Sequence, residues 1–371
     1  MNSKICCLFN YCTHYNTAIY RLMDLEIKCD FYSGDKLASP IKSIDFQELK
    51  GFKKILKNKF LLGNFYWQKG AISLVFQPYS TFIITGEPYC LSTWVILILS
   101  RFQGKKTILW SHGWYGNESA IKQVVKRIFF NLSSKILLYG NHAKAMMAEK
   151  GIKREKMETI YNSLDYDKQV SIREKQKVSH IYENHFGNKF PTLIYIGRIQ
   201  RRKKIELLIE AMGELKEKDV HCNLILIGGQ TEELDVYHLI KLNDLNNRVW
   251  NYGSCYDEEV LGELLFNASV CVSPGNVGLT AMHCLVYGTP CITQNNFSKQ
   301  MPEFEAIETN LTGDFFEEDS ISDLARKIHK WITITEGKRE LVRDACYHMI
   351  ASKYNPHIQL EILKKAIGSI N

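Results

Sequence analysis

The sequence predicts an α/β protein with two doubly wound domains, each a parallel sheet covered by helices on both faces. A chain of 371 residues is longer than one hydrophobic core usually organises. Short β-branched or aromatic runs alternate with helical patterns, which is typical of βαβ units on parallel sheets. The alternation stops in a charged stretch, 165–189, and then starts again. We therefore expect one domain on each side of this stretch.

The expected strands form two sets of apolar runs. The first set is 5–9, 81–85, 107–110 and 135–139. The second set is 191–196, 223–227, 248–252, 268–272 and 291–293. In doubly wound domains ligands bind beyond the carboxyl ends of the strands, so a cleft that the two domains face is the expected site.

These patterns set the expected domain boundaries. Residues 1–165 are expected to form a Rossmann-like N-terminal domain, 166–190 a charged linker, and 191–345 a Rossmann-like C-terminal domain. The last segment, 346–371, has a helical pattern with a break near Asn355-Pro356.

Composition and cysteine usage favour a cytoplasmic protein. Hydrophobic residues make up 45% and charged residues 23%, as in an ordinary soluble globular protein. The eleven cysteines form no CxxC pair and no cluster with histidine, which indicates reduced, buried thiols. The N-terminal apolar run is too short for a signal peptide. The most apolar segment, 93–100, is far below the roughly 20 residues of a membrane span.

The stretch 194–212 (IYIGRIQRRKKIELLIEAM) is the first chemical motif, in which a strand ends at Gly197 and a basic loop leads into an amphipathic helix. Glycine allows the sharp turn. The five cations within 198–204 repel each other unless an anion or open solvent relieves them. A diphosphate fits, since arginine offers a planar fork and lysine a point charge. A solvated basic turn is the competing interpretation.

The stretch 273–290 (SPGNVGLTAMHCLVYGTP) is the second motif, a loop with Gly275 and Gly278 that runs into a helix carrying His283. Backbone N–H groups at a helix start are unsatisfied and partly positive, so they suit a phosphate. Such turns are also common without a ligand. A lone histidine on an apolar helix is more often structural, so neither motif decides the function alone.

In combination, the two stretches resemble the retaining GT-B glycosyltransferases of the large group-1 family, which are family 4-like. Between them, Gly228-Gly229 resembles the turn after a family strand, and 248–260 (RVWNYGSCYDEEV) resembles the segment that borders the nucleotide base. Further on, 301–316 (MPEFEAIETNLTGDFF) is similar to the family's Pro-Glu segment and the turn that follows it. The resemblance is collinear from Lys135 to Leu324.

This resemblance implies a GT-B fold whose C-terminal helix returns to the N-terminal domain. It implies that Arg198 and Lys203 hold the diphosphate of a nucleotide sugar, where charge develops as the glycosidic bond breaks. The implied donor site also includes Gly197, Gly228, Tyr252, Gly253, Gly275, Asn276, Gly278, Leu279, Thr280 and His283. The family is metal-independent and is usually described by front-face attack, so neither a protein nucleophile nor a cofactor is expected.

A metal-dependent alternative is rejected on the same grounds. Asp165 and Asp167 spell the carboxylate pair that metal-dependent sugar transferases of the other major fold use. They follow 160–164 (IYNSL), however, which resembles the interdomain connection of the group-1 family. We therefore expect no metal site.

Two positions depart from the family pattern. The family typically has two glutamates eight apart in the donor loop and helix, where this chain has Gly275 and His283. The second glutamate commonly contacts ribose hydroxyls, and a histidine can replace that hydrogen bond. Gly275 has no side chain with which to replace the first glutamate, which contacts the sugar. Either the chain belongs to a subgroup with a different donor, or the site is inactive; the retained basic loop favours the subgroup.

The resemblance assigns acceptor binding to the N-terminal half. His14 and Tyr15 stand where the family has a loop facing the cleft, and Glu87 follows the strand 81–85. His112 stands where the family often has a histidine near the transferred sugar, so we expect it to be catalytic. The alternatives are loop histidines without a role and, for Glu87, a carboxylate at a helix start. Family acceptors are often lipid-linked sugars.

The stretch 50–62 (KGFKKILKNKFLL) interleaves lysines with large apolar residues. This pattern is typical of helices that lie on anionic membranes, and equally of ordinary surface helices. The net charge of +7 suits polyanionic small molecules, anionic membranes or nucleic acid without selecting among them. No recognised nucleic-acid-binding motif accompanies the charge, so we expect no nucleic acid. A peripheral position on the inner face of a membrane is one expectation for this segment.

The leading hypothesis is an enzyme that moves a sugar from a nucleotide sugar to a glycan or lipid-linked acceptor with retention, in surface polysaccharide biosynthesis. A non-catalytic nucleotide-sugar-binding partner subunit is the first alternative, prompted by Gly275 and His283. A GT-B-shaped nucleotide-sugar epimerase is the second. The nucleotide base, the sugar and the linkage stay open at this point.

Overall fold

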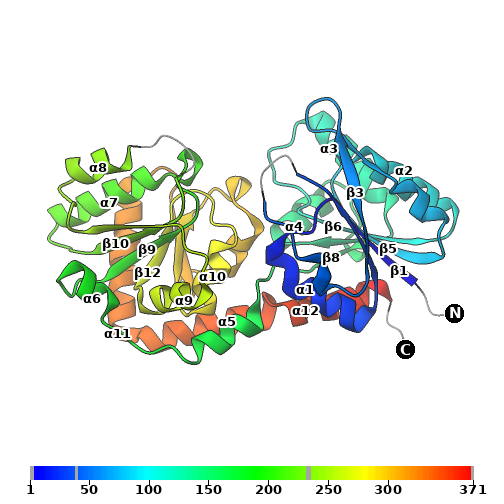
Figure 1. Cartoon of the computed structure of the whole chain (residues 1–371). Coiled ribbons are helices and arrows are strands. Elements are labelled where there is room, and N and C mark those ends of the chain that lie inside the picture. The colour runs from blue at the N-terminus through cyan, green and yellow to red at the C-terminus, as the bar shows by residue number, and fades with distance from the viewer. Residues whose placement is uncertain (1–3, 38–40, 231–234, 369–371) are drawn as a thin grey trace. The chain divides into compact units, whose positions relative to one another are not determined.

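The structure, a computed structural model, describes residues 4–37, 41–230 and 235–368. It divides into two compact units, each with its own sheet (Figure 1). Unit 1 comprises Met1–Asp165 and Asn355–Asn371, and unit 2 comprises Tyr166–Tyr354. The chain therefore leaves unit 1 once and returns to it near its C-terminal end.

Unit 1 is built on an eight-stranded sheet in the order β4-β3-β2-β1-β5-β6-β7-β8. Neighbouring strands are parallel except for β3 and β4, which form an antiparallel hairpin. The order reverses between β1 and β5, which creates a crevice outside the carboxyl ends of these strands. The strands are β1 (Lys4–Phe9), β2 (Asp30–Gly34), β3 (Phe52–Phe60), β4 (Tyr66–Lys69), β5 (Tyr79–Thr85), β6 (Lys106–Ser111), β7 (Lys135–Leu138) and β8 (Met157–Thr159).

Helices cover both faces of this sheet, because alternate residues of a strand point to opposite sides. On β1, Cys6 and Leu8 belong to the buried cluster that includes α2 and α3, whereas Cys7 and Phe9 belong to the cluster that includes α1 and α12. The helices are α1 (Thr17–Leu22), α2 (Leu91–Phe102), α3 (Ala120–Leu132), α4 (Asn141–Glu149) and α12 (Pro356–Ile367). Short 3-10 or π turns lie at His14–Asn16, Met23–Ile27, Phe46–Glu48, Ile72–Phe76 and Arg154–Lys156.

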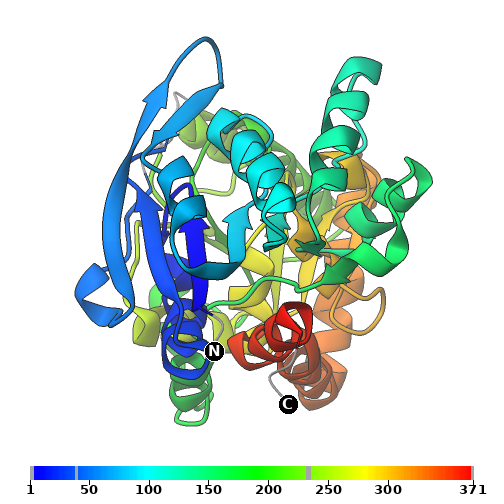
Figure 2. The same cartoon turned by 90° about the vertical axis from the view of Figure 1, so that its right-hand side faces the viewer.

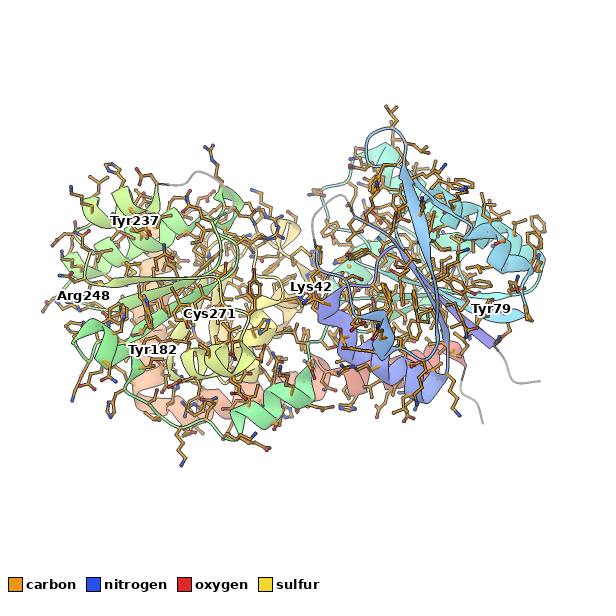
Figure 3. All side chains as sticks on the ribbon, viewed as in Figure 1. Lys42, Tyr79, Tyr182, Tyr237, Arg248 and Cys271 are labelled. Atoms are coloured by element: carbon orange, nitrogen blue, oxygen red, sulfur yellow. The ribbon has the colours of Figure 1, made fainter. Side chains whose placement is uncertain are left out.

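Unit 2 is built on a six-stranded parallel sheet in the order β11-β10-β9-β12-β13-β14. This order makes β9 and β12 neighbours, with Cys271 opposite Ile194. Figure 3 shows Cys271 among the strands of the unit, where it is fully buried. The strands are β9 (Thr192–Ile196), β10 (Asn223–Ile227), β11 (Val249–Gly253), β12 (Val270–Ser273), β13 (Cys291–Gln294) and β14 (Gly313–Phe316).

The helices of unit 2 end with the long helix α11, which is interrupted at Lys338. The expected break near Asn355-Pro356 is confirmed, since α11 ends at Lys353 and α12 begins at Pro356, inside unit 1 and against α1. The helices are α5 (Tyr166–Arg173), α6 (Ile181–Phe186), α7 (Ile205–Glu217), α8 (Val236–Leu242), α9 (Glu258–Asn267), α10 (Thr280–Val286) and α11 (Ile321–Lys353). Short turns lie at Arg201–Lys203, Phe297–Lys299 and Pro302–Ala306.

The segment 166–190, which the sequence suggests is a charged linker, contains α5 and α6. Gln169, Ile172 and Tyr182 are buried, and both helices pack against α9 of unit 2. The segment is therefore a packed part of unit 2 and not a free connection.

The stretch 50–62 is not a helix. Its central part is β3, which pairs with β2 on one side and β4 on the other. The spacing of Lys53 and Lys57 fits one face of a helix and one face of a strand equally well. The strand is favoured because Leu56 and Asn58 are buried, and the Asn58 amide donates to the carbonyl of Asn10 at 2.8 Å.

The cysteines are all free, and each is buried except the half-buried Cys255. None of the helices in the described ranges is both long and apolar enough to cross a membrane. Within the same ranges, no three side chains of His, Cys, Asp or Glu gather closely enough to hold a metal ion.

Candidate functional site

Two loops of unit 2 meet where its strand order reverses. The loop 197–204 follows β9, and the loop 274–279 follows β12. Because β9 and β12 are adjacent and parallel, both loops leave the same edge of the sheet. Open α/β sheets bind ligands at such switch points. The fold therefore brings together the two motifs that lie far apart in the sequence.

Three neighbouring strands, β9, β10 and β11, end at or next to glycines, and the backbones of these glycines lie close together. The N–H of Gly197 donates to the carbonyl of Ile227, and the N–H of Gly228 to that of Gly253, both at 2.9 Å. Gly228 has a φ of 156°, and a Cβ there would lie 1.9 Å from the carbonyl oxygen of Gly197. Only glycine fits at position 228. These three glycines and Tyr252, all expected in the donor site, lie along one edge of the sheet.

Lys203 is the cation of the basic loop that contacts the loop after β12. Its ammonium group donates to the carbonyl of Asn276, and its carbonyl accepts from the N–H of Gly275 at 3.0 Å. Arg198 is exposed, and its guanidinium group has no ion-pair partner among the residues that the structure describes. The two residues expected to hold a diphosphate thus differ in setting, one half-buried and one open to solvent.

The surroundings of Lys203 disfavour its positive charge. Burial, and after it the charges of Arg202 and Arg198, lower the pKa of Lys203 to about 8. The buried carboxylate of Glu303 acts in the opposite direction but does not outweigh them. A bound anion would remove this cost, because an opposite charge nearby favours the charged form. The site is therefore prepared for a polyanion such as a diphosphate.

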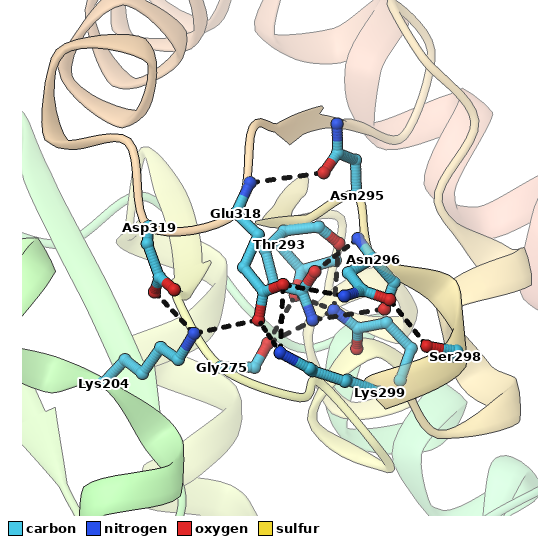
Figure 4. A network of polar contacts seen from close by, with 11 residues as sticks. Lys204, Gly275, Thr293, Asn295, Asn296, Ser298, Lys299, Glu318 and Asp319 are labelled. Carbon is cyan, nitrogen blue, oxygen red and sulfur yellow. Dashed lines mark hydrogen bonds and ion pairs between the residues drawn. The ribbon is translucent and has the colours of Figure 1, made fainter. Parts of the chain in front are cut away.

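Lys204, the last cation of the loop, is already paired within unit 2. Its ammonium group lies 3.0 Å from Glu318 and 2.5 Å from Asp319, and Lys299 lies 2.9 Å from Glu318 (Figure 4). Hydrogen bonds from Asn296, Lys299 and Lys204 lower the pKa of Glu318 to about 2. Lys204 therefore anchors the loop, whereas Lys203 has no carboxylate ion pair among the residues that the structure describes.

Buried polar side chains fix the loop 274–279. The Thr293 hydroxyl and the Gln300 amide donate to the carbonyl of Gly275 at 3.0 and 3.2 Å, and Figure 4 shows Thr293 beside Gly275. The Gln300 carbonyl accepts from the N–H of Val277 at 2.9 Å. Satisfied buried networks of this kind rigidify a loop, so the donor loop is preorganised.

Gly275 lies directly against the basic loop. A Cβ at this position would lie 2.2 Å from the carbonyl oxygen of Arg202 and 2.8 Å from Cα of Lys203. Real Cβ atoms do not approach backbone this closely, so a side chain here would displace the basic loop. The packing of the two loops therefore requires glycine at position 275.

The start of α10 is tied to the end of β9. The Thr280 hydroxyl donates to the carbonyl of Ile196 at 3.0 Å, and Gly278 turns the chain with a φ of 54°. Gly278, Leu279 and Thr280, whose amides are expected to grip phosphate, lie at this turn. Because α10 has only seven residues, its dipole is weak and charge complementarity has to come from the cations.

His283, on α10, lies beside a carboxylate that the sequence motif does not contain. Its Nδ1 is 3.3 Å from the amide nitrogen of Gln169 and 3.7 Å from Oε1 of Glu258. Gln169 and Tyr287 donate to Glu258 at 2.8 and 3.0 Å. Burial raises the pKa of Glu258, but His283, Gln169 and Tyr287 outweigh it and lower that pKa to about 2. Gln169 and Glu258 therefore fix the orientation of the His283 ring through its Nδ1.

Replacing His283 with Glu, the family residue, is expected to destabilise this chain by about 1–3 kcal/mol at neutral pH. The new carboxylate would lie beside ionised Glu258, and like charges at this distance disfavour each other. The repulsion raises a pKa in the folded state, so the loss shrinks as the pH falls below that pKa. Urea unfolding at pH 7 and at pH 5 measures the effect.

The matched control is the double variant His283→Glu/Glu258→Gln. It removes the second charge and is expected to recover most of the lost stability at pH 7. A single variant that is as stable as the wild type at pH 7 would show that the two side chains are not neighbours.

Unit 1 contains a cavity of about 380 Å³ at the carboxyl ends of β1, β5 and β6. Tyr15, Glu87 and His112, predicted from the sequence, all line it. His14 is exposed and outside this lining, with Nδ1 3.1 Å from the carbonyl of Lys42. Aromatic side chains make up much of the remaining wall: Tyr11, Tyr20, Tyr89, Trp110, Tyr115 and Tyr139.

Two polar groups of the cavity are defined by their surroundings, Glu87 by hydrogen bonds and His112 by burial. The Asn10 amide and the Tyr66 hydroxyl both donate to Oε2 of Glu87 at 2.8 Å. Burial, and after it the charge of Lys126, lower the pKa of His112 to about 4, so the ring is neutral at pH 7. A neutral imidazole exchanges hydrogen bonds with a hydroxyl but supplies no positive charge. If His112 takes part in catalysis, as the sequence predicts, it does so as a hydrogen-bonding group and not as a cation.

Several residues that shape the two sites were not among the predicted site residues. Gln169 and Glu258 orient His283, Thr293 holds the loop 274–279, and Asn10 holds Glu87. Two of the overlooked residues lie at recognised segments that could have drawn attention to them. Glu258 lies within 248–260, and Gln300 adjoins the Met301-Pro302-Glu303 run.

Comparison with known proteins relates most of unit 2 to one protein family. Residues 179–346 match the family model described as "Glycosyl transferases group 1". A relative from Klebsiella pneumoniae, described as "Uncharacterized 41.2 kDa protein in cps region", is 23% identical over 224 residues, and the match spans 58% of each chain. The chain thus covers little more than half the length of this relative. Residues 179–346 of unit 2 are therefore similar to the group 1 glycosyltransferases.

Solved structures show the fold of the whole chain. The lipopolysaccharide outer core galactosyltransferase WaaB, in its apo form, matches with a TM-score of 0.69 and 14% identity, over 98% of this chain and 99% of that one. Alr3699/HepE of Anabaena, in complex with UDP, matches with a TM-score of 0.70 and 16% identity over the same shares. The fold is GT-B, with two Rossmann-like domains, as the sequence predicts.

Proposed function

We propose that the protein is a retaining, metal-independent glycosyltransferase that moves a sugar from a nucleotide sugar to a glycan or lipid-linked acceptor. The observation that carries the proposal is the pair Arg198 and Lys203 at the switch point of unit 2, one half-buried with a lowered pKa and one unpaired. The group 1 domain supports a transferase. The Anabaena protein has been solved with UDP and with UDP-glucose, which supports a nucleotide-sugar donor.

Surface polysaccharide biosynthesis is the proposed setting. The Klebsiella relative is described by its place in a cps region, and WaaB acts on the lipopolysaccharide outer core by its name. Both descriptions point to glycans of the cell surface as the acceptor class for this chain.

In the proposed reaction, the bond between the anomeric carbon and the diphosphate oxygen breaks. The bond to the acceptor hydroxyl oxygen forms on the same face of the sugar, and the hydroxyl proton passes to the departing phosphate oxygen. Negative charge grows on the diphosphate during this step. Arg198 and Lys203 therefore stabilise the transition state more than the ground state, without a metal ion.

The remaining donor contacts are proposed from the resemblance and from the position of these residues at the same edge of the sheet. Gly197 and Gly228 allow the backbone to approach the ligand closely, and Tyr252 with Gly253 borders the base. The His283 ring donates to or accepts from a ribose hydroxyl, since an imidazole can do either. Gln169 and Glu258 position that ring and do not touch the ligand.

The cavity of unit 1 is the proposed acceptor site. Its aromatic wall suits the apolar face of a sugar ring, and Glu87 accepts from a sugar hydroxyl. The indole N–H of Trp110 is buried and has no acceptor among the described residues, so it offers one further donor. Neutral His112 completes the set as a hydrogen-bonding partner of the acceptor.

A nucleotide screen tests the proposal. UDP, GDP or dTDP is expected to raise the melting temperature, and Arg198→Ala is expected to weaken that binding about tenfold or more, because a charge-assisted bidentate contact is lost. Mass spectrometry of donors incubated with acceptor extracts then identifies the sugar. Binding to none of the three nucleotides would overturn the proposal.

The same assay separates the two alternatives. A partner subunit binds nucleotide but releases none from donor and acceptor together. An epimerase converts the donor when no acceptor is present. Nucleotide release that depends on an acceptor excludes both.

A further inference from the structure

The β3–β4 hairpin of unit 1 has a lysine-rich outward face. Lys53, Lys57 and Lys59 occupy alternate positions of β3, so they project to the same side of the strand, and all three are exposed. Lys69 of β4 stands opposite Lys57 in the antiparallel register. The face therefore gathers four ammonium groups from two paired strands.

Few acidic residues neutralise the positive charge of this face. No aspartate or glutamate occurs between Glu48 and Glu87, a region with six lysines at 50, 53, 54, 57, 59 and 69. Lys53 lies 3.2 Å from Asp30. Within the described residues Lys57, Lys59 and Lys69 have no ion pair. Like charges directly opposite each other on paired strands are destabilising, so this face is set up for an anionic partner.

The tip of the hairpin is apolar and exposed. Phe60, Leu61, Leu62 and Phe65 have exposed fractions of 39%, 59%, 86% and 44%. The N–H of Leu61 donates to the carbonyl of Phe65 at 2.8 Å, and Gly63, with a φ of 60°, closes the turn. Turns normally carry polar residues, so this apolar tip is unusual. Figures 1 and 2 both show the hairpin projecting from the body of unit 1.

We propose that this hairpin binds the surface of an anionic phospholipid bilayer. Lys57, Lys59 and Lys69 contact the headgroup phosphates, and the leucines of the tip enter the boundary between headgroups and acyl chains. The combination favours a bilayer, because basic residues are attracted to an anionic leaflet while exposed apolar side chains gain by leaving water. Lysines on a sheet edge also discourage pairing between edges, but that role does not account for the apolar tip.

The proposal is independent of the enzymatic activity. It rests on the charge and exposure of unit 1, whereas the proposed transfer rests first on unit 2. A lipid-linked acceptor would nevertheless be reached more readily by a protein held at the membrane surface.

Vesicle flotation tests the hairpin directly. The full chain is mixed with vesicles of phosphatidylcholine alone, or of phosphatidylcholine with phosphatidylglycerol, at low and at high salt. Binding is expected to the anionic vesicles only, and to weaken with salt because the headgroup attraction is screened. Absence of binding to the anionic vesicles at low salt would overturn the proposal.

Two variants separate the basic face from the tip. Lys57→Gln/Lys59→Gln/Lys69→Gln is expected to weaken binding to anionic vesicles about 100-fold, since each lysine near the surface contributes about 1 kcal/mol. Leu61→Ser/Leu62→Ser is expected to weaken it as well, with the salt dependence retained, because the lysines are still present.

Matched controls carry the same changes elsewhere on the surface. Lys168→Gln/Lys175→Gln/Lys177→Gln removes three exposed lysines of unit 2, and Leu242→Ser/Leu341→Ser removes two exposed leucines. Both controls are expected to bind as the wild type does. If the control variants lose as much vesicle binding as the hairpin variants, binding depends only on net charge or general hydrophobicity. That result would overturn the proposal. Hairpin-dependent binding to RNA or DNA without binding to vesicles would reassign the surface to nucleic acid.

Discussion

In the variant Lys203→Met, kcat/KM for the donor is expected to fall about 10²–10³-fold, because a preorganised charge next to the departing diphosphate is lost. Methionine keeps much of the length of the side chain and needs no hydrogen bond when buried. The structural role of the Lys203 backbone, whose carbonyl accepts from Gly275, is retained. Initial rates of nucleotide release, with the donor identified in the screen, measure the loss.

The adjacent residue provides the control. Lys204→Met removes a cation from the same loop, but its ammonium group is already paired with Glu318 and Asp319. The expected change in kcat/KM is much smaller than for Lys203→Met. Equal losses in the two variants would contradict the assignment of Lys203 to the diphosphate.

The pH dependence of nucleotide affinity gives a second readout for Lys203. Its pKa of about 8 in the free protein rises when an anion binds, so binding takes up a proton above pH 8. Affinity for UDP is therefore expected to be constant between about pH 7, where the terminal phosphate of UDP is ionised, and that pKa, and to fall up to about tenfold per pH unit above it. The fall should be absent in Lys203→Met. Parallel profiles in the two proteins would show that another group titrates.

In the variant Gly275→Ala, nucleotide binding is expected to be lost or weakened more than tenfold, and the free energy of unfolding to fall by about 1–3 kcal/mol. The new methyl group would lie 2.2 Å from the carbonyl oxygen of Arg202, a backbone atom that cannot rotate away. The basic loop must move, and Lys203 and Arg198 move with it. Calorimetric titration with UDP and urea unfolding measure the two effects.

Gly337 provides the matched control. A Cβ there meets nothing within 4 Å, and the residue lies in the long helix α11. Gly337→Ala is expected to leave binding unchanged and to be neutral or slightly stabilising, since alanine favours helix. If Gly275→Ala binds UDP as the wild type does, the close approach of the two loops does not exist in solution.

Together with His283→Glu, this variant tests the two positions at which the resemblance to the group-1 family predicts glutamate. A glutamate at position 275 would meet the backbone of the basic loop, and one at 283 would meet the carboxylate of Glu258. At both positions a neighbour therefore occupies the space or supplies the charge. This pattern is expected if the chain belongs to a subgroup with its own donor.

Most strands that could be predicted from the sequence are buried ones. Parallel strands with both faces covered are continuous apolar runs, which is why β1, β5 to β7, β9, β10, β12 and β13 were recognisable. None of the residues of the edge strand β11 is buried, and its β-branched and aromatic residues were the signal. β2 contains the polar residues Asp30 and Ser33, β8 has three residues, and β14 begins at a glycine. In β3 the spacing of the lysines fits one face of a strand, with a period of 2, as well as one face of a helix, with a period of 3.6. The strand conformation is decided by pairing with β2 and β4.

Candidate site residues could be predicted where they lie close together in the sequence. Arg198 and Lys203 share one loop, and the glycines mark the ends of strands, so a short window contains the signal. The ion pair that occupies Lys204 was not predictable, because its partner Glu318 is more than a hundred residues away in the sequence. The neutral state of His112 likewise depends on burial in the folded unit.

The close approach between Gly275 and the basic loop has a consequence for sequence variation. A larger residue at 275 can be accommodated only if the backbone at Arg202 takes a different path, and the contact between Lys203 and Asn276 changes with it. Among relatives, the residue type at 275 is therefore expected to covary with the length or composition of the loop 198–204. Glycine should accompany the loop seen here, and glutamate a loop that stands further away. Grafting a donor preference onto this chain would require both segments to be exchanged together.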